Sequence, residues 1–133
     1  MDKSAWKSKT SKVVAPWGHE VVWEALPSIR GKILFIQKGG RTSLKYHTGK
    51  DEVFYMMTGK AKIQYADEKW HYRKNYPFTE GDFTPGDCLT VQARCPYRIE
   101  ALEDCTIMEI GNSHIGETVR LEDDYGREVI GGA

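Results

Sequence analysis

The sequence has no net charge and no long apolar run. Lys+Arg and Asp+Glu each count 19 in 133 residues, so the chain lacks the basic excess that favours binding to nucleic acid or to an anionic membrane. No segment approaches the roughly 18 apolar residues needed to span a bilayer, and the polar N-terminus is unlike a secretory leader. We therefore expect no nucleic-acid partner, no membrane partner and a cytoplasmic location.

Cysteine is also scarce. The three cysteines form no CxxC pair and are odd in number, which argues against a disulfide framework and against a thiolate zinc site. Cys88 and Cys105 have apolar sequence neighbours, and small thiols in such surroundings are commonly buried. The sequence therefore predicts reduced cysteines that serve the core.

A helical period is missing as well. The chain instead carries short β-branched and aromatic runs between turn residues, which is typical of a sandwich or barrel. The runs are 20–26, 32–37, 52–59, 60–66, 88–93, 97–102 and 105–111. Residues 1–12 are rich in Lys and Ser and are predicted to form a flexible tail, and 13–133 to form one all-β domain.

The alternation of side chains places several ionisable groups on inward faces. In 97–101, Tyr97 shares a face with two apolar residues and is predicted to point inward. Lys45 and His47 are two residues apart and share a face, and Glu52 lies on the face of Phe54. Buried charges are costly unless they are paired, bound to a metal or exposed to a wet pocket, so this cluster marks a candidate site.

The stretch "GGRTSLKYHTGKDEVFYMMTG" resembles the first motif of the cupins, G-x5-H-x-H-x4-E-x6-G. Gly39, Lys45, His47, Glu52 and Gly59 fall on it with every spacing kept, and only the first histidine is changed. The second motif, G-x5-P-x-G-x2-H-x3-N, fits by position from Gly86. In place of the motif's proline, second glycine, histidine and asparagine, this chain has Gln92, Arg94, Tyr97 and Ala101, in that order.

Within the cupins the chain is most similar to the domain of type II mannose-6-phosphate isomerase and mannose-1-phosphate guanylyltransferase. The similarity rests on "APWGHEVV", "SLKYH", "PGD" and "VRLEDDYGR" and extends from Pro16 to Arg127. It implies a single-domain jelly-roll β-barrel, also called a double-stranded β-helix. It further implies a role in which a phosphorylated or nucleotide-linked sugar is converted or recognised.

The resemblance also implies a metal site, whose four ligand positions map onto Lys45, His47, Glu52 and Tyr97. A lysine ammonium has no lone pair, and a neutral phenol is a poor ligand. Two interpretations stay open. A divalent zinc, manganese or iron ion is bound by His47, Glu52 and Tyr97, or the charge of Lys45 replaces the metal and pairs with Glu52.

For an isomerase, the resemblance suggests roles for the same residues. Glu52 would be the base, His47 would carry protons, and Lys45 would stabilise negative charge on the substrate oxygen. The candidate contacts to the substrate and its anionic group are Arg41, Arg94, Tyr97 and Arg120.

Other interpretations remain beside the isomerase. One is a non-catalytic carbohydrate-binding or regulatory cupin with a degenerate metal site, and another is a metal-dependent oxygenase. The aromatic segment 66–83 is either a lid over the pocket or a hairpin packed on the outside. The run "VFYMM" is apolar on both faces, which predicts a covered second face and hence a homodimer.

Overall fold

The computed structural model describes residues 2–112 and 116–129. Strands dominate these residues, together with one short 3₁₀ helix, η1, at Glu68–His71. The strands are β1 Ser11–Ala15, β2 Gly18–Leu26, β3 Ile29–Ile36, β4 Leu44–His47, β5 Glu52–Thr58, β6 Ala61–Tyr65, β7 Thr79–Phe83, β8 Cys88–Val91, β9 Tyr97–Ala101, β10 Cys105–Gly111 and β11 Thr118–Glu122. No helix in the described ranges is long and apolar enough to cross a membrane.

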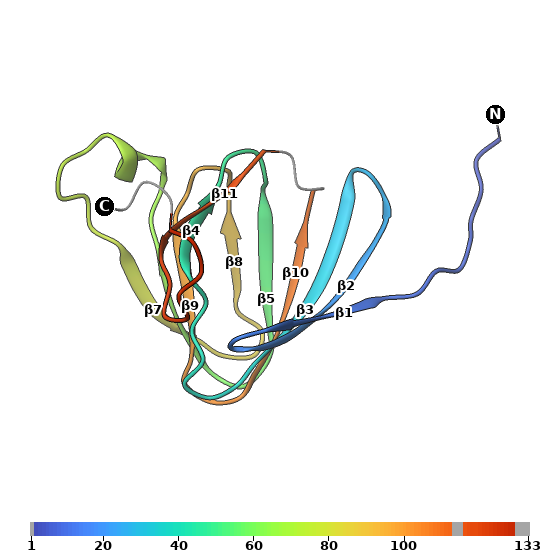
Figure 1. The fold of residues 1–133 in the computed structure, drawn as a ribbon, viewed down its shortest axis with the longest axis horizontal. Coiled ribbons are helices and arrows are strands. Elements are labelled where there is room, and N and C mark those ends of the chain that lie inside the picture. The colour runs from blue at the N-terminus through green and yellow to red at the C-terminus, as the bar shows by residue number, and fades with distance from the viewer. Residues whose placement is uncertain (1, 113–115, 130–133) are drawn as a thin grey trace.

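Two antiparallel sheets face each other across the core (Figure 1). One sheet has the order β1-β2-β3-β10-β5-β8, and the other has the order β11-β4-β9-β6-β7. Several neighbouring strands are far apart in sequence, as in the pairs β3 with β10 and β6 with β9. The prediction of an all-β jelly-roll barrel is confirmed.

The core lies between the sheets and follows the predicted alternation. Phe54 and Ile63 are at most 2% exposed, and Ile99 and Ile107 are fully buried. Burying one such side chain contributes roughly 1.5–3 kcal/mol. Glu52 shares the buried face of β5 with Phe54, so the same pattern that builds the core carries a carboxylate into it.

The outer face of the larger sheet is partly apolar. Val53, Tyr55 and Ile110 are 42–45% exposed there, on adjacent strands β5 and β10. This face is the second apolar face of "VFYMM", which the sequence predicts to be covered by a partner, and the homodimer stays a prediction.

Four strands were not predicted, and one prediction about cysteine is wrong. β1, β4, β7 and β11 are short, and β1 begins at Ser11 because residues 11–15 pair along their length with β2. Cys105 is buried as expected, but Cys88 is exposed. β8 alternates so that Leu89 and Val91 face the core, which turns Cys88 to the outer face.

Segment 66–83 forms η1 and β7, the edge strand of the smaller sheet that pairs with β6. The His71 ring packs edge-on against Tyr46 at 4.5 Å between centroids, and its Nε2 lies 2.6 Å from the carbonyl oxygen of Arg94. Tyr72 is 67% exposed. The described residues lining the cavity between the sheets include none from this segment. The hairpin interpretation therefore fits the structure, and the lid interpretation does not.

Candidate functional site

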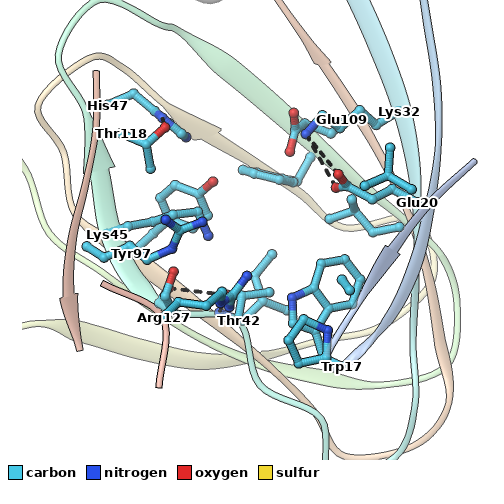
Figure 2. Close-up of a pocket in the computed structure, with 18 of the residues that line it drawn as sticks. Trp17, Glu20, Lys32, Thr42, Lys45, His47, Tyr97, Glu109, Thr118 and Arg127 are labelled. Carbon is cyan, nitrogen blue, oxygen red and sulfur yellow. Dashed lines mark hydrogen bonds and ion pairs between the residues drawn. The ribbon is translucent and has the colours of Figure 1, made fainter. Parts of the chain in front are cut away.

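A cavity of about 350 Å³ lies between the two sheets and is lined by both. Figure 2 shows that Lys45, His47 and Tyr97 lie on one side and that Glu20, Lys32 and Glu109 lie opposite them. Its charged and aromatic lining residues are Trp17, Glu20, Lys32, Lys45, His47, Lys50, Phe54, Tyr97, Glu109, Arg120 and Arg127. Of the residues that the sequence singled out, the cavity is lined by Lys45, His47, Tyr97 and Arg120, and Glu52 is not among its lining residues.

Three neighbouring strands of the smaller sheet place a row of side chains along this cavity. Arg120 on β11 is the cross-strand partner of Lys45 on β4, and Lys45 is the partner of Tyr97 on β9. Side chains directly opposite each other on adjacent strands share a face. Arg120, Lys45 and Tyr97 therefore stand side by side at one wall of the cavity.

Lys45 does not form the expected ion pair with Glu52. Its Nζ lies 4.8 Å from the centroid of the Tyr97 ring, as a cation over an aromatic face. Within the described residues it has no carboxylate partner at ion-pair distance. Burial disfavours its charged form and lowers its pKa to about 8. Lys45 is therefore a cation whose charge is not balanced by a carboxylate at ion-pair distance.

Arg120 is the second such cation. Its Nε–H is buried and donates to no partner among the described residues, and those residues offer it no ion pair. The other pocket cations differ, since Lys32 lies 3.3 Å from Glu20 and Arg127 lies 2.8 Å from Asp123. Like charges directly opposite on adjacent strands repel, so Arg120 and Lys45 leave an excess of positive potential at their wall.

Glu52 is held by three donors. His47 Nε2 and the Tyr97 hydroxyl each lie 3.1 Å from Oε1, and Lys50 Nζ lies 3.1 Å from Oε2. Oε2 accepts no aligned hydrogen bond from the described residues, so the contact with Lys50 is an ion pair. Burial acts to raise the pKa of Glu52, but the hydrogen bond from His47 and the charge of Lys50 outweigh it and lower the pKa. Glu52 is thus ionised and a weak base.

Lys50 and Glu109 complete this buried cluster, and the sequence analysis missed both. Lys50 Nζ lies 3.0 Å from Glu109 Oε2, and the two residues are 3% and 5% exposed. Glu109 follows Cys105 and Ile107 in the alternation of β10, so its inward direction was readable from the sequence. Lys50 lies in the turn between β4 and β5, where no strand period indicates direction.

The remaining titratable groups respond to the same burial. Burial lowers the pKa of His47, and its Nδ1 lies 2.9 Å from the Thr118 hydroxyl. Burial raises the pKa of Tyr97 well above its usual value, and the charge of Glu52 adds to this. Burial and Glu52 also raise the pKa of Glu109, to about 7. Glu109 is therefore the cavity carboxyl best matched to proton exchange near neutrality.

The residues present do not fit the metal that the resemblance implies. The described residues contain no group of three His, Cys, Asp or Glu side chains arranged to hold a cation. Tyr97 keeps its proton and donates a hydrogen bond to Glu52 Oε1. His47 contacts the same oxygen, and Lys50 contacts the other one, Oε2. Zinc and non-haem iron sites use at least three protein ligands. Here Glu109 is paired with Lys50, which leaves His47 and Glu52 available.

Two of the three candidate arginines lie away from the cavity. Arg41 forms two 2.7 Å hydrogen bonds to Asp124 on the outside of the smaller sheet. Arg94 has a positive φ of 73° in an exposed turn and lies 3.6 Å from Glu68. Arg120 alone of the three lines the cavity. The residues of the family-like ending "VRLEDDYGR" therefore lie in two places. Arg120 faces the cavity, whereas Asp124 binds Arg41 and, at 3.0 Å, the buried Arg98.

Comparison with known proteins supports the fold. No family model matches the sequence, and no curated protein does. Among solved structures, KdgF from Halomonas sp. has a TM-score of 0.64 at 15% identity, over 81% of this chain and 88% of that one. Oxalate decarboxylase of Bacillus subtilis, a structure described for its Mn(II) centres, has a TM-score of 0.72 at 18% identity over 90% of this chain.

A third solved structure has a similar fold. The coconut allergen cocosin has a TM-score of 0.67 at 15% identity, over 82% of this chain. The chain spans 34% of the oxalate decarboxylase and 30% of cocosin. These neighbours are cupin-fold proteins, so the fold and the cavity define a jelly-roll barrel of the cupin type.

Proposed function

We propose that the barrel cavity binds a small anionic carbohydrate, a phosphorylated or nucleotide-linked sugar. The observation that carries this proposal is the pair Arg120 and Lys45, two cross-strand neighbours that line the cavity without a carboxylate partner among the described residues. A phosphate oxygen placed between them would remove their repulsion and would satisfy the buried Nε of Arg120.

The remaining walls suit the rest of such a ligand. Trp17 and Tyr97 offer aromatic faces for a sugar ring, and Thr42 and Glu109 offer polar groups for its hydroxyls. A cavity of about 350 Å³ falls at the lower end of the range typical for small-molecule sites. This combination favours recognition of one sugar phosphate and requires no metal.

Aldose-ketose isomerisation, as in mannose-6-phosphate isomerase, is the second candidate function. Glu52 is less suited to be its base than the sequence suggested, because its pKa is lowered and its oxygens are engaged. Glu109 favours this candidate, since its pKa of about 7 allows it to take and return a proton near neutrality. A metal-dependent oxygenase has the least support, because the donor set does not fit a metal.

Calorimetric titration with mannose 6-phosphate and with mannose tests the proposal. We expect the phosphorylated sugar to bind and the neutral sugar to bind at least about tenfold more weakly, because a charge-assisted hydrogen bond contributes about 1.5–3 kcal/mol. Arg120→Gln and Lys45→Gln should each weaken binding, whereas Arg94→Gln, outside the cavity, should not. Equal affinity for the two sugars, or an equal loss in Arg94→Gln, would contradict the proposal.

A further inference from the structure

Lys50 lies between the carboxylates of Glu52 and Glu109, in the position that a bound cation would take between two acidic side chains. Lys50 Nζ lies 3.1 Å from Glu52 Oε2 and 3.0 Å from Glu109 Oε2. These carboxylates come from β5 and β10, which are hydrogen-bonded neighbours in one sheet. The ammonium therefore joins two acidic side chains that are only 2% and 5% exposed.

The turn that carries Lys50 is fixed on both sides. The Asp51 amide donates to the Asn112 side chain at 2.7 Å, and the Asn112 amide group donates to the Gly49 carbonyl at 3.2 Å. Gly111 leaves room for the lysine stem, because a Cβ there would lie 3.3 Å from Lys50 Cε and 2.8 Å from the Asp51 carbonyl oxygen. These contacts fix the turn from which the Lys50 side chain reaches the two carboxylates.

Electrostatics favour this arrangement over a metal ion. Lys50 Nζ lies within ion-pair distance of both carboxylates, and the side chain is 3% exposed, so their attraction is little screened by water. A divalent cation bonded to Glu52 at about 2 Å would lie next to the ammonium, where like charges repel strongly in a low-dielectric interior. Binding such an ion would require Lys50 to leave both carboxylates.

We propose that the Lys50 ammonium is a built-in replacement for a metal ion, which pairs with both Glu52 and Glu109 and lets the cavity operate without one. The sequence suggested this role for Lys45, whose ammonium instead lies over the Tyr97 ring. The inference concerns the acidic wall of the cavity and does not depend on which ligand Arg120 and Lys45 bind.

The test compares metal binding by purified full-length variants, measured by calorimetric titration with Zn²⁺ and Mn²⁺ alone. Wild type should bind neither ion stoichiometrically. Lys50→Met removes the ammonium and leaves His47, Glu52 and Glu109 around the vacated space, so its affinity should rise about tenfold or more. Lys50→Arg keeps a cation there and should show no rise.

Two further variants keep the test decisive. Lys32→Met removes another lysine that lines the cavity, partly buried and paired with Glu20, and should gain no metal affinity. Lys50→Met combined with Glu109→Gln removes one charge of each sign, which favours folding even if the single variant unfolds, and should also show no gain. Tight stoichiometric binding by wild type would overturn the proposal. So would a folded Lys50→Met variant, verified by circular dichroism, with unchanged affinity, or an equal gain in the Glu109→Gln double variant.

Discussion

The Tyr97 hydroxyl on β9 donates a hydrogen bond to Glu52 Oε1 on β5 across 3.1 Å, which joins the two sheets through the core. Both side chains are 2% exposed, so water cannot replace the lost donor if the hydroxyl is removed. This bond connects the row of Arg120, Lys45 and Tyr97 to the acidic cluster on the opposite sheet.

We therefore expect Tyr97→Phe to lower the free energy of unfolding by about 1–3 kcal/mol, the usual cost of leaving a buried acceptor short of a donor. Urea unfolding followed by tryptophan fluorescence measures the change. Tyr55→Phe is the matched control, because Tyr55 lies 45% exposed on the outer face of β5. An equal loss in both variants would contradict the structural role of the Tyr97 hydroxyl.

Asp124 should make the stability of the chain sensitive to acid. The hydrogen bonds from Arg41 hold the pKa of Asp124 below its usual range, so its contribution is present above the unfolded-state pKa of about 3.9 and is lost as the pH falls through the lower folded-state value. Asp124→Asn should therefore destabilise the fold at pH 7, by about 1 kcal/mol after allowance for solvent screening, and should differ little from wild type near pH 2.

Urea unfolding at a series of pH values from 7 down to 2 gives that comparison. Asp82→Asn is the control, because Asp82 is 50% exposed and lies 3.5 Å from Lys60, where an ion pair contributes little. A constant difference between Asp124→Asn and wild type across the whole pH range would show that the Arg41 contact is not the source of the effect.

Gly59, the last residue of the cupin-like motif, should tolerate no side chain. Its φ is 83°, and a Cβ would clash with the backbone carbonyl oxygen of Asp104. Gly86 has a similar φ of 98° but no atom within 4 Å of the Cβ position. We expect Gly86→Ala to cost about 1 kcal/mol from backbone strain alone and Gly59→Ala to cost clearly more, as measured by thermal unfolding. Equal losses would mean that conformation, not the close approach of Asp104, requires glycine at 59.

The aromatic residues of segment 66–83 should not affect ligand binding. Tyr72 is exposed on the outside of the barrel, so Tyr72→Ser should leave the affinity for mannose 6-phosphate within about twofold of wild type, a difference of under half a kcal/mol. Calorimetric titration checks this beside Arg120→Gln. A loss in Tyr72→Ser as large as that in Arg120→Gln would restore the lid interpretation.

The sequence by itself determined the class of fold and one part of the site. Two-residue alternation in 52–58 and 97–101 specifies which side chains enter the core, because a strand turns successive residues to opposite faces. That rule alone places Glu52 and Tyr97 inside. The motif spacing from Gly39 to Gly59 predicted the jelly-roll fold that the structure has. Glu109 was equally readable by its alternation with Ile107.

Tertiary structure decided the partners of these charges. Lys50 lies in a turn, where side-chain direction depends on contacts such as those of Asn112, and its pairing with Glu109 joins residues 59 positions apart. Arg41 and Arg120 have the same chemistry in the sequence, yet one binds Asp124 outside the barrel and the other faces the cavity. Strand order and register set these outcomes, because long-range pairing in a jelly roll is established by the packing of the whole chain and not by any local pattern.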